Sequence, residues 1–570
     1  MVLNEIIRSA RGKKEVDLLL TNARIVNVFS GEIALGDIAV AQGYIVGFGS
    51  YDSKKEIDIG GRFVAPGFID AHVHIESTMT CMTEFVRAVL PFGTTTVIAD
   101  PHEIANVLGV AGINYMLQSS ENQPMNIYFN LPSCVPATDM ETSGAKLTAE
   151  DLLPFMTDQR ILALAEMMNY PGVIHEDPEV LLKIKSIQKY RKPVDGHAPG
   201  LSGRDLYAYI SAGISSDHEC TTAKEAMEKL NAGMRIMIRE GTGAKNLNDL
   251  LPIVNSKTSR RFMLCTDDRH LYDILEKGHI DSMVRRAIKT GIDPMLAIQM
   301  ATINSAEYFG IGHLGGIGPG QQADLIVFSD IENLYVEQVY HQGNLVVEDG
   351  NISPEIDHPE SLSVPSTMNV NMDKIDLSIP AKGRRIRVMD IIPDQNTTLK
   401  SIFKASMLDG MAISDIDRDI LKIAVVERHI GSGNVGKGFV RGFGLKRGAL
   451  VSSVAHDAHN IIVVGTNDSD MKVAIETVVD MGGGLAAVCD GRICAALELP
   501  IAGLMSYEPI DAVNDQLGGL LIAARDFGST LTYPFMTLSF LALPVIPELR
   551  ITDKGLIDVT RFKAVPLFVD

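Results

Sequence analysis

At residues 66–76 the chain reads Pro-Gly-Phe-Ile-Asp-Ala-His-Val-His-Ile-Glu, and its architecture can be worked out from this run. Apolar and small residues lead into His72 and His74, which are separated by one position. Because residues i and i+2 of a β-strand point to the same face, the two imidazoles are expected to project into one cavity. Two imidazoles that converge at the end of a buried strand form half of a metal site. The rest of the chain must supply the remaining ligands.

Length and composition restrict the class of protein. At 570 residues the chain exceeds what one hydrophobic core normally serves, so two to four domains are expected. Hydrophobic residues make up 46% and charged residues 21%, which is typical of a well-packed soluble protein. The net charge of −20 argues against nucleic acid or an anionic membrane as the main partner. It favours a small neutral or cationic ligand, or a metal centre that collects carboxylates.

Cysteine usage and the apolar segments indicate the compartment. The six cysteines contain no CxxC pair, so a reduced, cytoplasmic setting is expected. The first residues do not show the pattern of a signal peptide. The most apolar tract, at 535–546, is short and contains Pro544, so no membrane span is expected.

Short strands separated by turns are expected in two distant segments. The candidates are residues 23–29, 37–41 and 44–48 in the first segment, and 324–328, 336–340 and 345–347 in the second. A few strands alone cannot bury a face of a sheet. We therefore expect residues 1–62 and 321–350 to form one composite β-sandwich domain, with residues 63–320 inserted between them.

The insert alternates apolar, β-branched runs with helix-like segments. The strand candidates are residues 94–98, 127–129, 161–165, 194–196, 214–216, 236–238 and 262–265. This alternation over residues 63–320 is what a (β/α)8 TIM-like barrel requires, and such a barrel carries its catalytic groups at the carboxyl ends of the strands. An open, doubly wound sheet is the alternative. The polar residues that directly follow strands favour the barrel.

These strand-end residues are of types that bind metals. The six are His72, His74, Glu166, His197, His218 and Asp267. Together they suit two divalent cations, with Glu166 as a carboxylate bridge and a hydroxide shared between ions ~3.5–4 Å apart. Carboxylate and imidazole ligands without cysteine are compatible with manganese, iron or zinc.

The run at 66–74 resembles the first-strand motif of the amidohydrolase superfamily. His197, His218 and Asp267 match the positions that follow its fifth, sixth and eighth strands. The resemblance implies metal-activated hydrolysis of C–N or P–O bonds. Many members bridge their metals with a carboxylated lysine on the fourth strand. This chain has Glu166 there, which excludes a carbamate bridge at that position.

Longer runs narrow the resemblance to one family. They are residues 74–79, 99–109, 165–173 and 195–201 in the barrel segment, and 438–445 and 452–465 near the C-terminus. These runs look like bacterial and archaeal adenine deaminases. The resemblance implies purine salvage by hydrolysis of adenine to hypoxanthine and ammonia, with a metal-bridging hydroxide attacking C6. It also implies Mn2+ or Fe2+, with Zn2+ possible, and a homodimer or higher homo-oligomer. The alternative is another amidohydrolase on the same scaffold, such as a cyclic amidase or a deacetylase.

The resemblance also implies residue roles. Asp267 is expected to move a proton from the hydroxide to the leaving ammonia, as the last-strand aspartate does across the superfamily, and His218 to bind or polarise the site. Attack at C6 is easier when a ring nitrogen is protonated or hydrogen-bonded, so a second acid should face the purine. Glu240 is the catalytic candidate for this role, and Glu219 and His102 are candidates for binding the substrate. For Glu240 the alternative is an ion pair with Arg235 or Arg239, and for His102 it is a loop-capping role.

The last third of the chain reads as a further domain. Residues 351–375 are expected to be a linker, and residues 376–570 an α/β domain with strands at 384–389, 422–427 and 461–465 and a helix at 471–480. The segment 431–438 nearly matches a phosphate-binding loop. Gly438 stands where that loop needs Ser or Thr, so we expect no nucleotide site there.

A dense polar run at 455–460, Ala-His-Asp-Ala-His-Asn, precedes the strand at 461–465. His456 is our candidate for reaching into the barrel mouth and contacting the purine. A separate metal site formed with Asp457 and His459 is one alternative. A hydrogen-bonded loop between two domains is the other.

Overall fold

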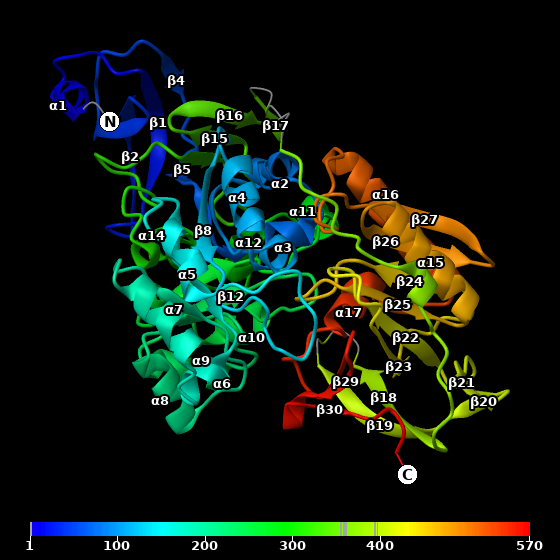
Figure 1. Cartoon of the computed structure of the whole chain (residues 1–570). Coiled ribbons are helices and arrows are strands. Elements are labelled where there is room, and N and C mark those ends of the chain that lie inside the picture. The colour runs from blue at the N-terminus through cyan, green and yellow to red at the C-terminus, as the bar shows by residue number, and fades with distance from the viewer. Residues whose placement is uncertain (1–2, 354–355, 357–361, 393–394, 396, 570) are drawn as a thin grey trace.

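The computed structural model describes residues 3–353, 356, 362–392, 395 and 397–569. In Figure 1 an N-terminal sheet lies at the upper left, a barrel surrounded by helices lies below it, and a second sheet region lies at the right. Within the described part of the chain, no helix is both long and apolar enough to cross a membrane.

One mixed sheet joins the start of the chain to residues 325–352. Its strands are β1 (Leu18–Asn27), β2 (Glu32–Ala41), β3 (Tyr44–Phe48), β4 (Glu56–Asp58), β5 (Phe63–Pro66), β14 (Leu325–Phe328), β15 (Gln338–His341), β16 (Asn344–Glu348) and β17 (Asn351–Ile352). The two segments meet where β5 runs antiparallel to β14, with Val64 opposite Val327. Both valines are fully buried in one apolar cluster with Leu20 and Ile38, so the two segments stabilise each other.

Eight parallel strands of the described chain close into a barrel. They are β6 (Phe68–Val73), β7 (Thr94–Ala99), β8 (Asn126–Leu131), β9 (Ile161–Met167), β10 (Val194–Gly196), β11 (Ser216–Asp217), β12 (Arg235–Arg239) and β13 (Phe262–Cys265). Strands β6 to β10 pair in chain order, as do β11 to β13. Parallel bridges from Val194 to Ile214 and from Val73 to Asp267 join the two sets. The expected (β/α)8 barrel is confirmed, and the open sheet is excluded.

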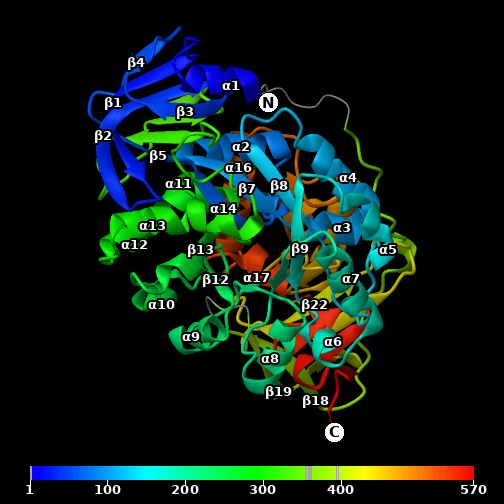
Figure 2. The same cartoon turned by 90° about the vertical axis from the view of Figure 1, so that its left-hand side faces the viewer.

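Helices surround the barrel strands (Figure 2). They are α2 (Met82–Val89), α3 (His102–Leu108), α4 (Val110–Ser119), α5 (Ala149–Leu152), α6 (Tyr170–Ile174), α7 (Pro178–Gln188), α8 (Gly203–Ser211), α9 (Ala223–Asn231), α10 (Leu247–Leu250), α11 (Leu271–Lys277), α12 (Ile280–Lys289), α13 (Pro294–Met300) and α14 (Ile303–Phe309). A further helix, α1 (Leu3–Ala10), packs beside β3.

Burial on both faces explains the composition of the barrel strands. Every residue of β6, β7 and β9 is buried, as expected for parallel strands that are covered by helices outside and side chains inside. Gly67 precedes β6 at a close approach, because a Cβ atom there would lie 2.1 Å from Oγ1 of Thr95. A larger residue at 67 would therefore displace the strand that carries His72.

The C-terminal region is built on an eight-stranded sheet with the order β19-β18-β23-β22-β25-β24-β26-β27. Its strands are β18 (Arg385–Ile391), β19 (Thr398–Lys404), β22 (Ile420–Val426), β23 (Val435–Arg441), β24 (Ala449–Ser452), β25 (Ile461–Gly465), β26 (Gly484–Cys489) and β27 (Arg492–Glu498). Two small sheets flank it, formed by β20 (Ser406–Leu408) and β21 (Met411–Ile413), and by β28 (Leu549–Thr552), β29 (Gly555–Asp558) and β30 (Lys563–Val565). The helices are α15 (Asp468–Asp480), α16 (Ile510–Asp526) and α17 (Pro534–Phe540).

This arrangement confirms the expected α/β character of the last third of the chain. The glycine-rich segment at 431–438 runs directly into strand β23, so no helix follows it to cradle a phosphate. Of the expected linker at 351–375, residues 354, 355 and 357–361 lie outside the described residues. Its described part begins with strand β17 (Asn351–Ile352) and contains a turn of 3-10 helix at Met372–Lys374.

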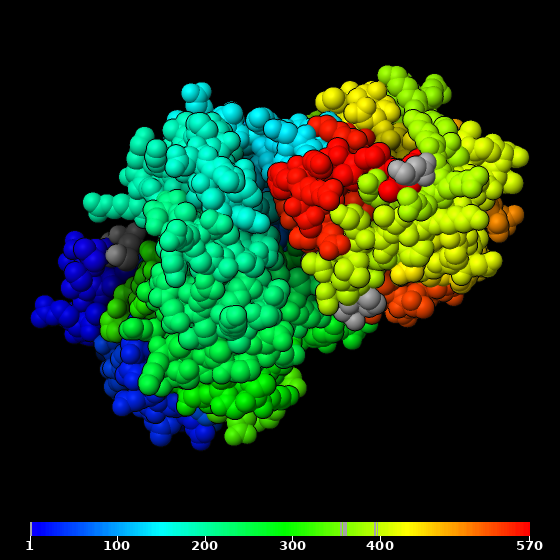
Figure 3. All heavy atoms as spheres, turned by 90° about the horizontal axis from the view of Figure 1, so that it is seen from below, coloured from blue at the N-terminus to red at the C-terminus, as the bar shows by residue number. Residues whose placement is uncertain are grey.

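The barrel and the C-terminal region share one apolar core, in which Phe85 and Ile104 of the barrel lie in the same cluster as Leu450 and Leu485. Polar contacts reinforce this interface. The backbone N–H and the hydroxyl of Thr142 donate to Asp553 at 2.9 and 2.7 Å. In Figure 3 the C-terminal segment (red) lies between the barrel (cyan and green) and the C-terminal sheet (yellow). The barrel mouth is thus covered by the C-terminal region.

Candidate functional site

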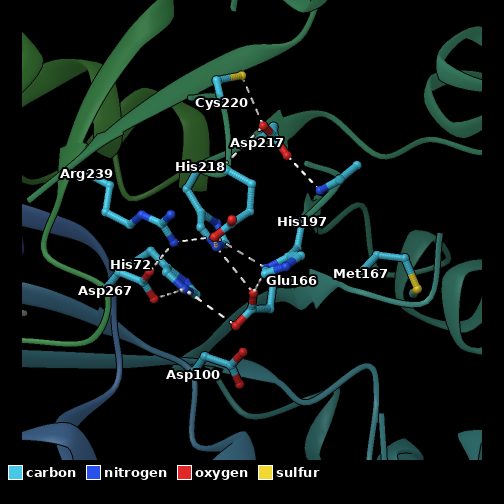
Figure 4. Close-up of polar contacts among 12 residues, drawn as sticks. His72, Asp100, Glu166, Met167, His197, Asp217, His218, Cys220, Arg239 and Asp267 are labelled. Carbon is cyan, nitrogen blue, oxygen red and sulfur yellow. Dashed lines mark hydrogen bonds and ion pairs between the residues drawn. The ribbon is translucent and has the colours of Figure 1, made fainter. Parts of the chain in front are cut away.

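The six predicted ligands meet at the carboxyl ends of the barrel strands. His72 lies on β6 and Glu166 on β9, whereas His74, His197, His218 and Asp267 each directly follow a strand or lie two residues beyond its end. Glu166 lies at the centre of the group (Figure 4). The barrel thus brings side chains that are spread over nearly 200 residues of sequence together in one buried cluster.

The two carboxylate oxygens of Glu166 face different pairs of histidines. Oε1 lies 3.7 Å from Nε2 of His72 and 3.3 Å from Nε2 of His74. Oε2 lies 2.6 Å from Nδ1 of His197 and 3.2 Å from Nε2 of His218. A carboxylate placed in this way can bind one cation through each oxygen, which is the arrangement expected of a bridge.

Asp267 completes the half of the cluster that contains His72 and His74. Its Oδ1 lies 3.5 Å from Nε2 of His72 and 3.1 Å from Nε2 of His74. The residue has a φ of 58°, in the left-handed region that non-glycine residues seldom adopt. Such backbone strain is common where a side chain is held in a functional direction.

Several donor atoms in the cluster suit a metal. Nδ1 and Nε2 of His72 and Nε2 of His218 are buried and make no hydrogen bond. Nδ1 of His74 lies 3.0 Å from the carbonyl oxygen of Asp100, which can only accept. Nδ1 therefore carries the proton, and the lone pair of Nε2 points toward Glu166 and Asp267. Orphaned imidazole nitrogens and ionised carboxylates within 4.8 Å of one another fit a divalent cation.

The charges of the cluster are balanced internally. Burial alone would raise the pKa of Glu166, but His197, His218 and His74 overcome it and hold that pKa well below its ordinary value. Burial likewise opposes the ionisation of Asp267, whereas Arg239, His72 and His74 lower its pKa well below the usual range. Burial lowers the pKa of His218, but Glu166 and Asp267 more than compensate and raise it to about 9. Both carboxylates are thus ionised at neutral pH.

Arg239, at the end of β12, was not among the residues predicted for the site. Its Nη1 donates to Oδ2 of Asp267 at 2.5 Å and to Oε1 of Glu219. Glu219 in turn lies 3.4 Å from Nε2 of His218, so this predicted substrate-binding residue does lie at the cluster. The strand-end rule that selected Glu166 applies equally to Arg239 and could have found it.

Glu240 is a predicted site residue that the structure does not bring to this cluster. Its carboxylate pairs with Arg286. Successive residues of a strand point to opposite faces, so Glu240 faces away when Arg239 faces into the barrel. The residue that pairs with Glu240 is therefore neither Arg235 nor Arg239.

His102 lies beside the cluster, together with Asp100. Nδ1 of His102 is 3.2 Å from Oδ2 of Asp100 and 3.7 Å from Oε1 of Glu166. Its Nε2 is 3.8 Å from Oδ1 of Asp457, which belongs to the C-terminal region. Sequence reasoning missed Asp100, although it directly follows β7. His102 therefore connects the ligand cluster to the covering loop.

The polar run at 455–460 reaches the barrel mouth. Nδ1 of His456 lies 3.2 Å from Oε1 of Glu103, and Nε2 of His459 lies 3.6 Å from Oε2 of the same residue. Nδ1 of His459 accepts the backbone N–H of Ala455 at 3.2 Å, so the proton of its neutral ring is on Nε2. That nitrogen has no lone pair for a metal, and His459 is placed to donate toward Glu103 instead. The ring of His456 stacks on Phe540 at 4.5 Å.

Comparisons with known proteins agree with this geometry. Residues 63–346 match the model of the amidohydrolase family, and residues 395–563 match that of the adenine deaminase C-terminal domain. A relative from Desulfatibacillum aliphaticivorans, named adenine deaminase, is 56% identical over 568 residues, which is 100% of each chain. One from Methanothrix thermoacetophila with the same name is 50% identical over 572 residues, again 100% of each chain. A third, adenine deaminase 2 of Carboxydothermus hydrogenoformans, is 48% identical over 569 residues, 99% of each chain.

Proposed function

We propose that this chain, which belongs to the adenine deaminase family, hydrolyses adenine to hypoxanthine and ammonia. The observation that carries this proposal is Glu166, whose two oxygens each face a pair of histidines in a chain that matches adenine deaminases over its whole length. Membership of the amidohydrolase family implies a divalent metal.

We propose two divalent cations as the cofactor, Mn2+ or Fe2+, with Zn2+ also compatible with the ligands. His72, His74 and Asp267 would hold one cation, His197 and His218 the other, and Glu166 would bridge them. When bound, two such cations activate a water at neutral pH and stabilise the charge that develops during its attack. The chain's own residues then have to orient the purine and move protons.

Asp267 is our proposed proton carrier. Its carboxylate is ionised beside Arg239, and its Oδ1 faces Nε2 of both His72 and His74. It can accept a proton from the attacking water and deliver it to the amino group as the C6–N bond breaks and the C6–O bond forms. Ammonia then leaves as a neutral molecule. His218, which lies close to both Glu166 and Glu219, is proposed to bind and polarise the site.

Three residues at the rim are proposed to hold the purine. His102 and Glu219 lie against the cluster, and His456 lies beside Glu103 at the barrel mouth. Each has a charged partner that fixes its orientation: Asp100, Arg239 and Glu103, respectively. Glu103 pairs with Nδ1 of His456, so Nε2 of His456 is available to contact a ring nitrogen of the purine. Burial alone would lower the pKa of His456, but Glu103 and Asp268 raise it to about 9, which keeps the ring protonated as a donor.

The test is release of ammonia by metal-reconstituted protein from adenine, compared with adenosine, guanine, cytosine and dihydrouracil. We expect adenine to be the preferred substrate, and no release from adenine would refute the proposal. Glu166→Gln should lose one or both cations and most of the activity. Glu150→Gln, at an exposed position of α5, should keep the two cations and the activity. Two bound cations in Glu166→Gln would refute the bridge.

The remaining proposals concern the organisation of the chain. We propose the division into residues 1–62 plus 321–350, 63–320 and 376–570, which the two family matches support. We also propose a homodimer or higher homo-oligomer, to be tested by sedimentation velocity. The six cysteines are free thiols in the structure, which supports a cytoplasmic location.

A further inference from the structure

A cavity of about 210 Å³ lies beside strands β12 and β13 and is lined mainly by cations. The cationic side chains that line it are Lys245, Arg269, Lys277, Arg285, Arg286 and Lys289. Only two carboxylates, Glu240 and Asp273, line it as well. Such a concentration of positive charge is unusual in a chain whose net charge is −20.

The carboxylates near this cavity are already engaged. Glu240 pairs with Arg286, and Asp281 pairs with Arg285. Asp273 accepts Nζ of Lys277 at 2.5 Å, and also the hydroxyl groups of Thr242 at 2.6 Å and Tyr533 at 2.9 Å. The acidic groups therefore neutralise three of the six cations.

The other three, Arg269, Lys245 and Lys289, form no ion pair with any described residue. Arg269 is the most telling because only 3% of it is exposed. Its Nη1 donates to the backbone carbonyl of Glu240 at 3.0 Å, and its buried Nε has no hydrogen-bond partner. A buried charge without a partner is costly, and proteins normally supply a counter-ion for it. Glu240 and Asp273 lie near Arg269 but form no ion pair with it, so the cavity that Arg269 lines is the place where a counter-ion can bind.

We propose that this cavity binds a small phosphate-type oxyanion, either inorganic phosphate or the phosphate group of a small ester. A guanidinium fork matches the oxygens of a phosphate, and lysines on two sides add charge without fixed geometry. Pockets for drug-sized ligands occupy about 300–1,000 Å³, so this smaller cavity suits an anion of few atoms. The site is distinct from the metal cluster, because Glu240 and Arg269 face it while Arg239 and Asp267 face the barrel interior.

The test is isothermal titration calorimetry of full-length, metal-loaded protein with inorganic phosphate in a phosphate-free buffer. We expect one saturable site per chain. The affinity should fall at least tenfold in the double variant Lys245→Ala/Lys289→Ala, whose two positions are exposed and should not affect folding. Arg269→Gln should weaken binding further. Lys472→Ala, at an exposed position of α15, is the matched control and should bind like the unaltered chain.

Ribose 5-phosphate, titrated in parallel, distinguishes the two sources of the phosphate group. Tighter binding of the ester identifies an ester ligand, whereas equal or tighter binding of inorganic phosphate identifies the free anion. The proposal is overturned if phosphate shows no saturable binding. It is also overturned if the double variant binds as tightly as the unaltered chain, because binding would then not depend on the lysines of the cavity. The titration contains no adenine and measures binding alone. Its outcome is therefore independent of whether the protein deaminates adenine.

Discussion

Replacing Lys229 with methionine is expected to destabilise the barrel and loosen the histidines on two of its strands. Nζ of Lys229 donates to Oδ2 of Asp217 at 3.0 Å, to the carbonyl oxygen of Ala198 at 2.7 Å and to Oε1 of Glu225 at 2.8 Å. Ala198 follows His197, and Asp217 precedes His218. One buried ammonium thus joins the strand ends that carry two predicted ligands.

The expected loss of stability in Lys229→Met follows from the burial of the ion pair. The side chains of Lys229 and Asp217 are both 0% exposed, so methionine leaves a buried carboxylate without its cation. Breaking such a pair costs about 3–5 kcal/mol. The contact with Glu225 adds little because that side chain is partly exposed, and methionine keeps most of the apolar stem. A loss of about 3–5 kcal/mol lowers the folding equilibrium constant roughly 10²- to 10⁴-fold. Metal affinity is expected to fall about 10- to 100-fold, as for other groups that orient ligands.

The assay compares Lys229→Met with Lys224→Met, which lies at an exposed position on the same helix. Urea midpoints of the metal-free proteins give the stability difference, and hydrogen exchange of residues 194–220 localises it. Burial alone would raise the pKa of Asp217, but Lys229 and His218 lower it. The stabilisation is therefore present above about pH 4 and is lost as the pH falls below that value. Midpoints of the two variants that coincide at pH 7 would refute the reasoning.

Three further predictions follow. Gly436→Ala places a Cβ 1.7 Å from the carbonyl oxygen of Thr552 and should lower the stability of the protein by about 1–3 kcal/mol. Gly519→Ala, in open space on α16, should raise the stability by about 0.5–1 kcal/mol. Thermal unfolding midpoints of the two variants test this. Arg239→Lys cannot keep both Asp267 and Glu219 in place, so metal affinity in chelator competition should fall about 10-fold or more; unchanged affinity would contradict this. Glu427 accepts hydrogen bonds from the backbone N–H groups of Ile430 and Ser432, which lower its pKa against the effect of burial. Glu427→Gln should therefore lower the stability of the protein by about 1–3 kcal/mol at pH 7, and by progressively less as the pH falls below about 4. A stability difference that is independent of pH would argue against this.

Local sequence patterns were sufficient for the barrel and for the cluster of predicted ligands. Parallel strands place their carboxyl ends at one side, so a polar residue after a strand identifies the site without knowledge of the packing. Glu166 and His218 could be selected in this way. Arg239 and Asp100 obey the same rule, since one ends β12 and the other directly follows β7, and both were overlooked.

Contacts between distant segments could not be predicted. Glu103 and His456 are separated by more than 350 residues, and no periodicity relates them. Their contact depends on how the C-terminal region packs on the barrel. Glu240 shows that the strand-end rule can also select a residue that lies outside the site. It directly follows β12, yet the alternation of side chains turns it toward Arg286. A strand-end position therefore has to be combined with the face on which the side chain lies.

Glu166 also has a consequence for how this site is assembled. A carboxylated lysine forms only when an amine combines with carbon dioxide, so a centre built on one depends on dissolved bicarbonate as well as on metal. The carboxylate of Glu166 is part of the polypeptide, and histidines already surround it in the folded chain. Protein stripped of its cations should therefore regain them at the same rate in degassed, bicarbonate-free buffer as in air.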